Sequence, residues 1–181
     1  MAINEELLLR QLRQPQTASA AFAVLVKEYT EPLYWHLRRL VVDHDDANDL
    51  LQNTFIKAWT NIDGFLGNSK ISTWLYRIAT NEALTFLKKQ NANDTVSLDD
   101  EDAATPQLEA DEYFDGDELQ LRLQQALQTL PPKQRTVFNM KYFDEMKYEE
   151  MSQILNTSVG ALKASYHLAV KKIASFFEDD I

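Results

Sequence analysis

Apolar residues recur three and four positions apart along most of this chain, which is the spacing of helices that bury one side. Strand-like alternation is hard to find, and the chain has only four glycines. The pattern therefore predicts an all-α protein. The expected helices span residues 5–13, 18–41 (where Pro32 favours a bend), 46–62, 72–90, 119–130, 132–142, 148–155 and 159–177.

One stretch interrupts the helical pattern: residues 91–118 carry eleven acids and no Lys or Arg. Residues 1–90 hold ten basic and ten acidic side chains, and residues 119–181 hold eight basic and seven acidic ones. The net charge of −10 therefore arises in the acidic run. A block of like charges stays solvated and buries too little apolar surface to order itself. We expect residues 91–118 to form a flexible acidic linker between two small helical domains, residues 1–90 and 119–181. The net charge thus does not argue against a nucleic-acid partner for either half.

Catalytic and metal-binding patterns are absent from the sequence. His36, His44 and His167 fall in three different predicted elements, and no HExxH, GxSxG, phosphate-loop or CxxC pattern occurs. The acidic run lacks the Asp/Asn and Gly order of a calcium loop. We therefore predict neither an enzyme nor a bound metal or cofactor.

The composition also bears on location. The chain has no cysteine, which suits a reducing compartment. No apolar run approaches the roughly 20 residues that span a bilayer, and the first 13 residues are acidic and amphipathic, unlike a signal peptide. We expect a cytoplasmic protein without membrane insertion.

The C-terminal half has the dimensions of a helix-turn-helix. An eight-residue helix from Tyr148 is followed by Asn156, which favours a left-handed helix end, and by Ser158, which can cap the long helix that follows. The outward side of this second helix and its start would present Thr157, Ser158, Ala161, Lys163, Ser165, His167 and Lys171, with the helix N-terminus available to a phosphate. A helical hairpin that binds nothing is the alternative interpretation.

In the N-terminal half, the helix predicted over residues 72–90 has two distinct sides. One side is a core stripe, Leu75, Ile78, Ala79, Ala83, Phe86 and Leu87, and the other is a mixed stripe, Thr73, Trp74, Arg77, Asn81, Thr85 and Lys88. Cations can hold phosphates, while Trp74 and Asn81 can meet unstacked bases. The preceding loop, residues 63–71, is polar and glycine-containing, so that a splayed base could lodge in it. Trp74 could equally be a core anchor.

The helix predicted from Asp46 is also two-sided. Its inward residues are Ala47, Leu51, Phe55, Ala58 and Trp59, and its outward ones are Asp49, Gln52, Asn53 and Ile56. An apolar Ile56 among polar neighbours is a candidate docking surface.

Two motifs resemble a known family. Residues 46–59 with Phe65 and residues 71–83 (ISTWLYRIATNEA) resemble region 2 of the extracytoplasmic-function (ECF) group of bacterial sigma-70 factors. LPPKQRTVF at 130–138, YEEMSQIL at 148–155 and SVGALK at 158–163 resemble region 4 of the same group. Both motifs occur in the family's order around an acidic segment.

The resemblance implies a protein that binds core RNA polymerase and directs promoter-specific initiation. It implies contact with the beta-prime clamp through Asp49, Gln52, Asn53, Phe55 and Ile56, and contact with a beta flap type surface. It implies that the −10 element is opened and read by Ser69, Lys70, Ser72, Thr73, Trp74, Arg77, Asn81, Thr85 and Lys88, and the −35 element by the helix from Val159. An anti-sigma factor is a further implied partner, and the acidic run would pass through the polymerase toward the RNA exit path.

The sequence departs from the family at two places. Asn53 stands where many members have Glu, and the reading helix has Ser165, Leu168 and Val170 where members often have arginines. The promoter sequence therefore does not carry over. Two other classes stay open: a sigma-like interaction protein that titrates an anti-sigma factor, and a free-standing helix-turn-helix repressor, which would need a dimer and a more basic C-terminal half.

Overall fold

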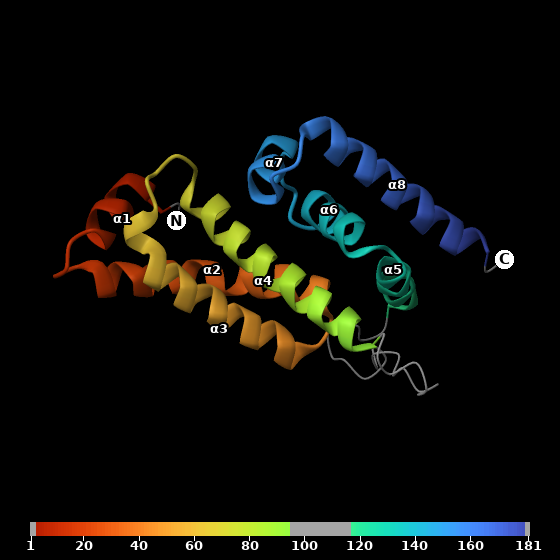
Figure 1. Cartoon of the computed structure of the whole chain (residues 1–181), viewed down its shortest axis with the longest axis horizontal. Coiled ribbons are helices and arrows are strands. Elements are labelled where there is room, and N and C mark those ends of the chain that lie inside the picture. The colour runs from red at the N-terminus through yellow and green to blue at the C-terminus, as the bar shows by residue number, and fades with distance from the viewer. Residues whose placement is uncertain (1–2, 95–116, 180–181) are drawn as a thin grey trace. The chain divides into compact units, whose positions relative to one another are not determined.

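The computed structural model describes residues 3–94 and 117–179 and is all-helical over them, which confirms the predicted fold class. Within these residues the helices are α1 (Glu5–Leu12), α2 (Ala18–Val41), α3 (His44–Asn61), the 3-10 turn η1 (Ile62–Gly64), α4 (Ile71–Asp94), α5 (Glu118–Gln128), α6 (Pro132–Tyr142), α7 (Tyr148–Leu155) and α8 (Val159–Glu178) (Figure 1). None of the helices in the described ranges combines the length and apolar character that crossing a bilayer requires.

The chain forms two compact units, Met1–Thr85 (the N-terminal unit) and Phe86–Ile181 (the C-terminal unit). The division falls inside α4, which continues as one helix to Asp94. Residues 91–94, which we predicted to begin the linker, are therefore helical, and that boundary was wrong. Of the rest of the predicted linker, residues 95–116 lie outside the described residues, and Glu118 already belongs to α5. At its far end, Asp117 caps α5 by accepting a hydrogen bond from the Leu119 amide (3.1 Å).

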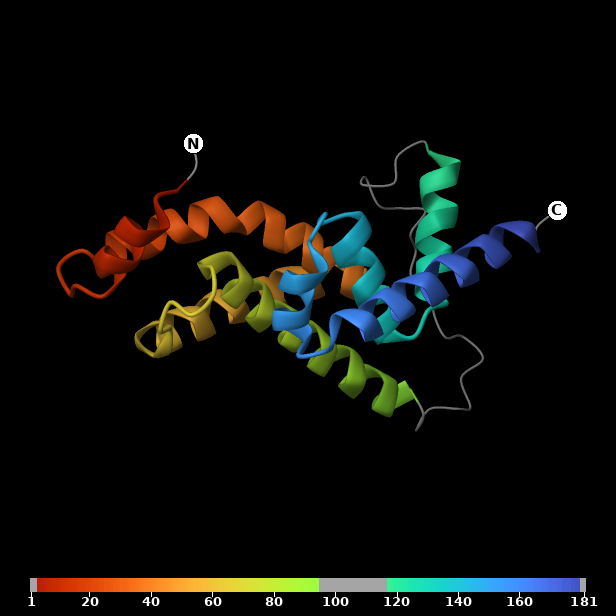
Figure 2. The same ribbon diagram turned by 90° about the horizontal axis from the view of Figure 1, so that it is seen from above.

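The N-terminal unit is built on α2, a helix that continues through Pro32, with α1 and α3 packed against it (Figure 2). Its core is aliphatic: α2 contributes Leu25, Leu33, Leu37 and Leu40, α3 contributes Ala47, Leu50, Leu51 and Ala58, and α4 contributes Ile71, Leu75, Ala79 and Ala83. One polar link crosses this core, since His36 Nε2 and Thr80 Oγ1 lie 2.9 Å apart with both side chains fully buried. The buried side of α4 thus includes Thr80 in addition to residues of the predicted core stripe.

Two helices of this unit begin earlier than predicted because carboxylates cap them. Asp43 accepts a hydrogen bond from the Asp46 amide (3.0 Å), so α3 begins at His44. Glu5 of α1 accepts one from the Ile71 amide, so α4 begins at Ile71. An acceptor at a helix start satisfies a donor that has no partner within the helix.

The C-terminal unit packs α8 against α5, α6 and α7. Its core gathers Ala126, Leu127, Leu130, Phe138, Ala169 and Ile173. The Phe138 ring stacks on Tyr166 (5.7 Å between centroids) and on Tyr142 (5.2 Å). Pro131 and Pro132 open α6, where a missing amide hydrogen costs nothing.

The predicted helix-turn-helix is present in α7 and α8. Asn156 ends α7 in the left-handed conformation (φ 50°, ψ 47°), and Ser158 caps α8 by accepting a hydrogen bond from the Ala161 amide (3.2 Å). Its inner side buries Met151, Ile154, Leu162 and Ala169, whereas Leu155, Val159 and Tyr166 are half-buried.

Candidate nucleic-acid interface

The mixed stripe on α4 lies mostly at the surface. Asn81 and Thr85 are exposed, Trp74 and Arg77 are half-buried, and Lys88 is exposed on the part of α4 beyond the N-terminal unit. The Trp74 ring packs on Phe65 (5.1 Å between centroids, 36° between planes). Because the Trp74 side chain is only half-buried, it both anchors the loop and keeps part of its surface open.

The prediction that Thr73 belongs to the outward mixed stripe is wrong, because Thr73 is only 5% exposed. Thr73 precedes the fully buried Thr80 by seven residues, or two helical turns, and so it belongs to the buried side of α4. The polarity of Thr73 therefore did not indicate that its side chain is exposed. The periodicity of the apolar residues alone did not reveal that Thr80 faces His36 in the core.

The loop before α4, residues 65–70, is anchored at its ends. Phe65 is buried, while Leu66 is 74% exposed and Lys70 is exposed. Ser69 is half-buried, and its hydroxyl donates a hydrogen bond to the Lys70 carbonyl (3.3 Å). Ser72 is also half-buried and lies near the hydroxyl of Tyr29. Burial, and then the nearby carboxylates of Glu5 and Glu28, raise the pKa of Tyr29 above its usual value, so this hydroxyl stays protonated at neutral pH.

The outward side of α8 combines small side chains with few cations. Ala161, Lys163, His167 and Lys171 are exposed, as is the capping Ser158, whereas Thr157 and Ser165 are half-buried. The Thr157 hydroxyl donates a hydrogen bond to the Leu155 carbonyl (3.0 Å). The end of α7 and the start of α8 are thus held by contacts between residues near in sequence.

Tyr148 links Lys163 to the rest of the helix-turn-helix, and we did not predict this contact from the sequence. Lys163 Nζ lies 5.6 Å from the centroid of the Tyr148 ring, and Lys141 Nζ lies 4.6 Å from it. Both distances are in the range of cation–π attraction. The three residues come from three helices, so no local spacing could have indicated this group.

The outward side of α3 carries the residues that the resemblance assigns to polymerase. Asp49, Gln52 and Asn53 are exposed, and Ile56 is 63% exposed. Phe55 is half-buried, with its ring edge-on to Phe22 (6.4 Å between centroids). Trp59, which we predicted to point inward, is 45% exposed and rests on Phe22 (4.9 Å).

The start of α3 is strongly acidic. The pKa of Asp46 is raised above its usual value, first by burial and then by the charges of Asp43, Asp49 and Asp45. This end of the helix is therefore a concentrated negative surface.

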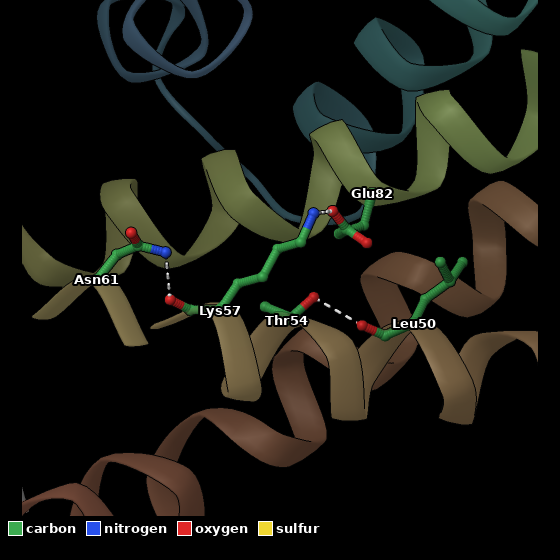
Figure 3. Close-up of polar contacts among 5 residues, drawn as sticks. All are labelled: Leu50, Thr54, Lys57, Asn61 and Glu82. Carbon is green, nitrogen blue, oxygen red and sulfur yellow. Dashed lines mark hydrogen bonds and ion pairs between the residues drawn. The ribbon is translucent and has the colours of Figure 1, made fainter. Parts of the chain in front are cut away.

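A cross-helix ion pair joins α3 to α4 (Figure 3). Lys57 Nζ reaches the carboxylate of Glu82, whose side chain is 18% exposed. Thr54, fully buried one turn earlier, donates its hydroxyl hydrogen to the Leu50 carbonyl (2.7 Å), and Asn61 Nδ2 donates to the Lys57 carbonyl (2.8 Å) (Figure 3). The pair therefore links α4 to α3 at the residue that follows Asn81.

Over residues 3–94 and 117–179, no group of three His, Cys, Asp or Glu side chains is arranged to hold a metal ion.

Comparison with known proteins follows the same division of the chain. Residues 25–93 match the family Sigma-70 region 2, and residues 120–173 match Sigma-70, region 4. The chain is 36% identical over 175 residues to the ECF RNA polymerase sigma factor SigW of Bacillus subtilis, a match that covers 90% of this chain and 92% of SigW.

Two solved structures share the fold. One is CnrH in complex with the cytosolic domain of CnrY (TM-score 0.72, 22% identity, covering 98% of this chain and 99% of CnrH). The other is the sigma factor RpoE in complex with the anti-sigma factor NepR from Bartonella quintana (TM-score 0.70, 24% identity, covering 88% of this chain and 98% of RpoE). Taken with the matches to regions 2 and 4, the identity to SigW over nearly the whole of both sequences shows that this chain belongs to the ECF group of the sigma-70 family of transcription initiation factors.

Proposed function

We propose that residues 1–90 act as a region 2 domain that binds core RNA polymerase and opens and reads the −10 element. In this proposal residues 119–181 act as a region 4 domain that reads the −35 element and binds a beta flap type surface. The observation that carries the proposal is the pairing, on one chain, of two kinds of exposed helix surface: the loop-flanked stripe of α4 and the capped start of α8. Neither enzymatic activity nor a cofactor enters this proposal, and the site of action is the cytoplasm.

For the −10 element, the proposed contacts are Ser69, Lys70, Ser72, Trp74, Arg77, Asn81, Thr85 and Lys88. Exposed amides can hydrogen-bond to base edges, and an aromatic ring with an open face can stack on an unpaired base. Asn81 is exposed and Trp74 is half-buried on Phe65, so both requirements are met on neighbouring turns of α4.

For the −35 element, the proposed contacts are Thr157, Ser158, Ala161, Lys163, Ser165, His167 and Lys171. The start of a helix that lies in the major groove presents its first residues to base edges. With few cations on this side, electrostatic attraction to duplex DNA is weak. We therefore expect the free chain to bind promoter duplex poorly and to depend on polymerase for stable promoter contact.

For polymerase, the proposed contacts are Asp49, Gln52, Asn53, Phe55 and Ile56 of α3. Exposed Ile56 supplies an apolar centre with polar residues around it, which is the usual composition of a transient interface. An anti-sigma factor is a further proposed partner, supported by the shared fold with the RpoE–NepR complex.

The test is reconstitution of initiation with the full chain. The purified chain is mixed with core polymerase, complex formation is followed by gel filtration, and transcripts started from genomic fragments are mapped at their 5′ ends. We expect a stable complex and a defined set of start sites that share −10 and −35 elements.

Three results would contradict the proposal. Absence of both a complex and a transcript would remove the sigma-factor function. Binding to an anti-sigma factor without polymerase association would favour the titrating interaction protein, and tight binding of a duplex by the free chain as a dimer would favour the repressor.

A further inference from the structure

The loop at residues 65–70 is tied to α1 at both of its ends. Arg13, which caps the C-terminal end of α1, donates a hydrogen bond from Nη2 to the Phe65 carbonyl (3.2 Å). Glu5, the first residue of α1, accepts a hydrogen bond from the Ile71 amide. One eight-residue helix therefore holds the first residue of the loop and the residue that follows its last one.

Both anchored backbone groups lie where water cannot readily replace the contact. Phe65 is 5% exposed and Ile71 is 2% exposed. The Ile71 amide is one of the donors at the start of α4 that have no partner within the helix, and a carboxylate is the acceptor that the positive end of a helix favours most. Loss of either side chain thus removes the partner of a backbone group that belongs to a buried residue.

The middle of the loop, by contrast, is open. Leu66 is 74% exposed, and Gly67 has φ +76°, a conformation that side chains rarely adopt. Residues 66–70 therefore form a short span whose shape depends on where its two ends are held. The anchored Phe65 also supports Trp74, because the two rings pack 5.1 Å apart.

We propose that Glu5 and Arg13 are positioning residues, which fix the ends of the loop at residues 65–70 so that its open middle and Trp74 are preorganised to receive an unpaired base of the −10 strand. This inference rests on the proposed function of the loop. In this inference α1 shapes the −10 site, although it carries none of the residues proposed to contact DNA. Holding a binding loop in its bound conformation reduces the ordering cost of binding.

The chain supplies matched controls on the same helix. Glu6 and Arg10 form an exposed ion pair (2.7 Å, side chains 78% and 72% exposed). The variants Glu5→Ala and Arg13→Ala remove the loop contacts, whereas Glu6→Ala and Arg10→Ala make the same changes of charge and size without touching the loop. Glu5→Gln keeps an acceptor for the Ile71 amide and serves as the conservative rescue.

The first measurement is hydrogen exchange of the full chain without DNA or polymerase. We expect exchange of the amides of residues 66–71 to accelerate by about tenfold in Glu5→Ala and Arg13→Ala, as for the loss of a helix cap, and to stay unchanged in the controls. Unchanged exchange at these amides, or acceleration spread evenly over the N-terminal unit, would overturn the positioning role.

The second measurement is the affinity of the reconstituted holoenzyme for a single-stranded oligonucleotide that carries the −10 element of a mapped promoter. We expect Glu5→Ala and Arg13→Ala each to weaken binding by about tenfold, with polymerase association unchanged and with Glu5→Gln close to wild type. If Glu5 and Arg13 only stabilised the fold, their loss would weaken strand binding and polymerase association together.

The two possible failures are distinguishable. If the wild-type holoenzyme does not bind the strand, the proposed function fails, and the DNA part of this inference falls with it. If the wild type binds and the two variants bind equally well, the proposed function stands and this inference is overturned.

Discussion

The two candidate DNA-facing helices, α4 and α8, are held in place by contacts of different range. On α4, Trp74 packs on Phe65, the helix start is capped by Glu5, and Glu82 pairs with Lys57 of α3. On α8, the cap comes from Ser158 and the preceding turn from Asn156, both within three residues of the helix start. The α4 surface therefore depends on the tertiary structure of the N-terminal unit, whereas the start of α8 is set mainly by its own neighbourhood in sequence.

The two proposed DNA contacts differ in how rigid their surroundings must be. A site that opens DNA must hold an unpaired base in a defined pose, which needs rigid surroundings. A helix that enters the major groove of an intact duplex needs only a firm start and the right side chains. Substitutions of the packed residues of α4, such as Trp74, should consequently affect stability and activity together, whereas substitutions of exposed residues on α4 or α8 should act mainly on binding.

The largest expected effect is that of Trp74→Ala. Removal of a half-buried indole from Phe65 should destabilise the N-terminal unit by about 2 kcal/mol, less than for a fully buried tryptophan, and should abolish promoter opening. Urea unfolding and permanganate footprinting of the promoter measure the two effects. Trp74→Phe, which keeps a ring against Phe65, should recover most of the stability, and a fully stable Trp74→Ala would show that the two rings are not coupled.

Asn81→Ala should separate activity from stability on the same helix. Because Asn81 is exposed, we expect an unchanged unfolding midpoint, but loss of a base contact should slow open-complex formation by about tenfold. Arg77→Ala should act in the same direction with some added destabilisation, since Arg77 is half-buried. Gln16→Ala, which removes an exposed amide from the same unit, is the control, and loss of folding in Asn81→Ala would place its side chain in the core instead.

Lys163→Ala tests the proposed DNA contact of α8. Loss of one phosphate contact should weaken promoter binding by the holoenzyme several-fold and lower the slope of log affinity against log salt by about one. The cost in stability should be small, about 0.5 kcal/mol, from the lost contact with Tyr148. Fluorescence anisotropy over a salt series measures the affinity and the slope. Lys133→Ala removes an exposed charge from α6 and should change neither, and unchanged affinity in Lys163→Ala would take Lys163 out of the interface.

The smallest expected effect is that of Glu82→Gln, which probes the link between α3 and α4. The pair is partly exposed on the Lys57 side, so its loss should cost about 0.5 kcal/mol in the free energy of unfolding. The more exposed pair of Glu6 and Arg10 gives a comparison, with an expected cost for Glu6→Gln of about 0.3 kcal/mol. A loss above about 2 kcal/mol in Glu82→Gln would mean that the pair behaves as a buried one.

The local elements could be predicted because their signals are local. The periodicity of apolar residues located every α-helix of the described residues to within a few positions, and the Asn156 and Ser158 signals located the turn before α8. The errors at helix starts came from caps. Asp43 lies just before α3 and could have been used, whereas Glu5 is 66 residues away from the amide that it caps.

The all-helical class, the helix-turn-helix and the apolar face of most helices follow from the sequence alone, because they depend on spacing along one helix. In contrast, the burial of Thr73, the packing of Trp74 on Phe65 and the anchoring of the loop between α3 and α4 by Glu5 and Arg13 arise only when the helices pack together. Such contacts join residues that no periodicity relates, since their partners are chosen by the way whole helices pack.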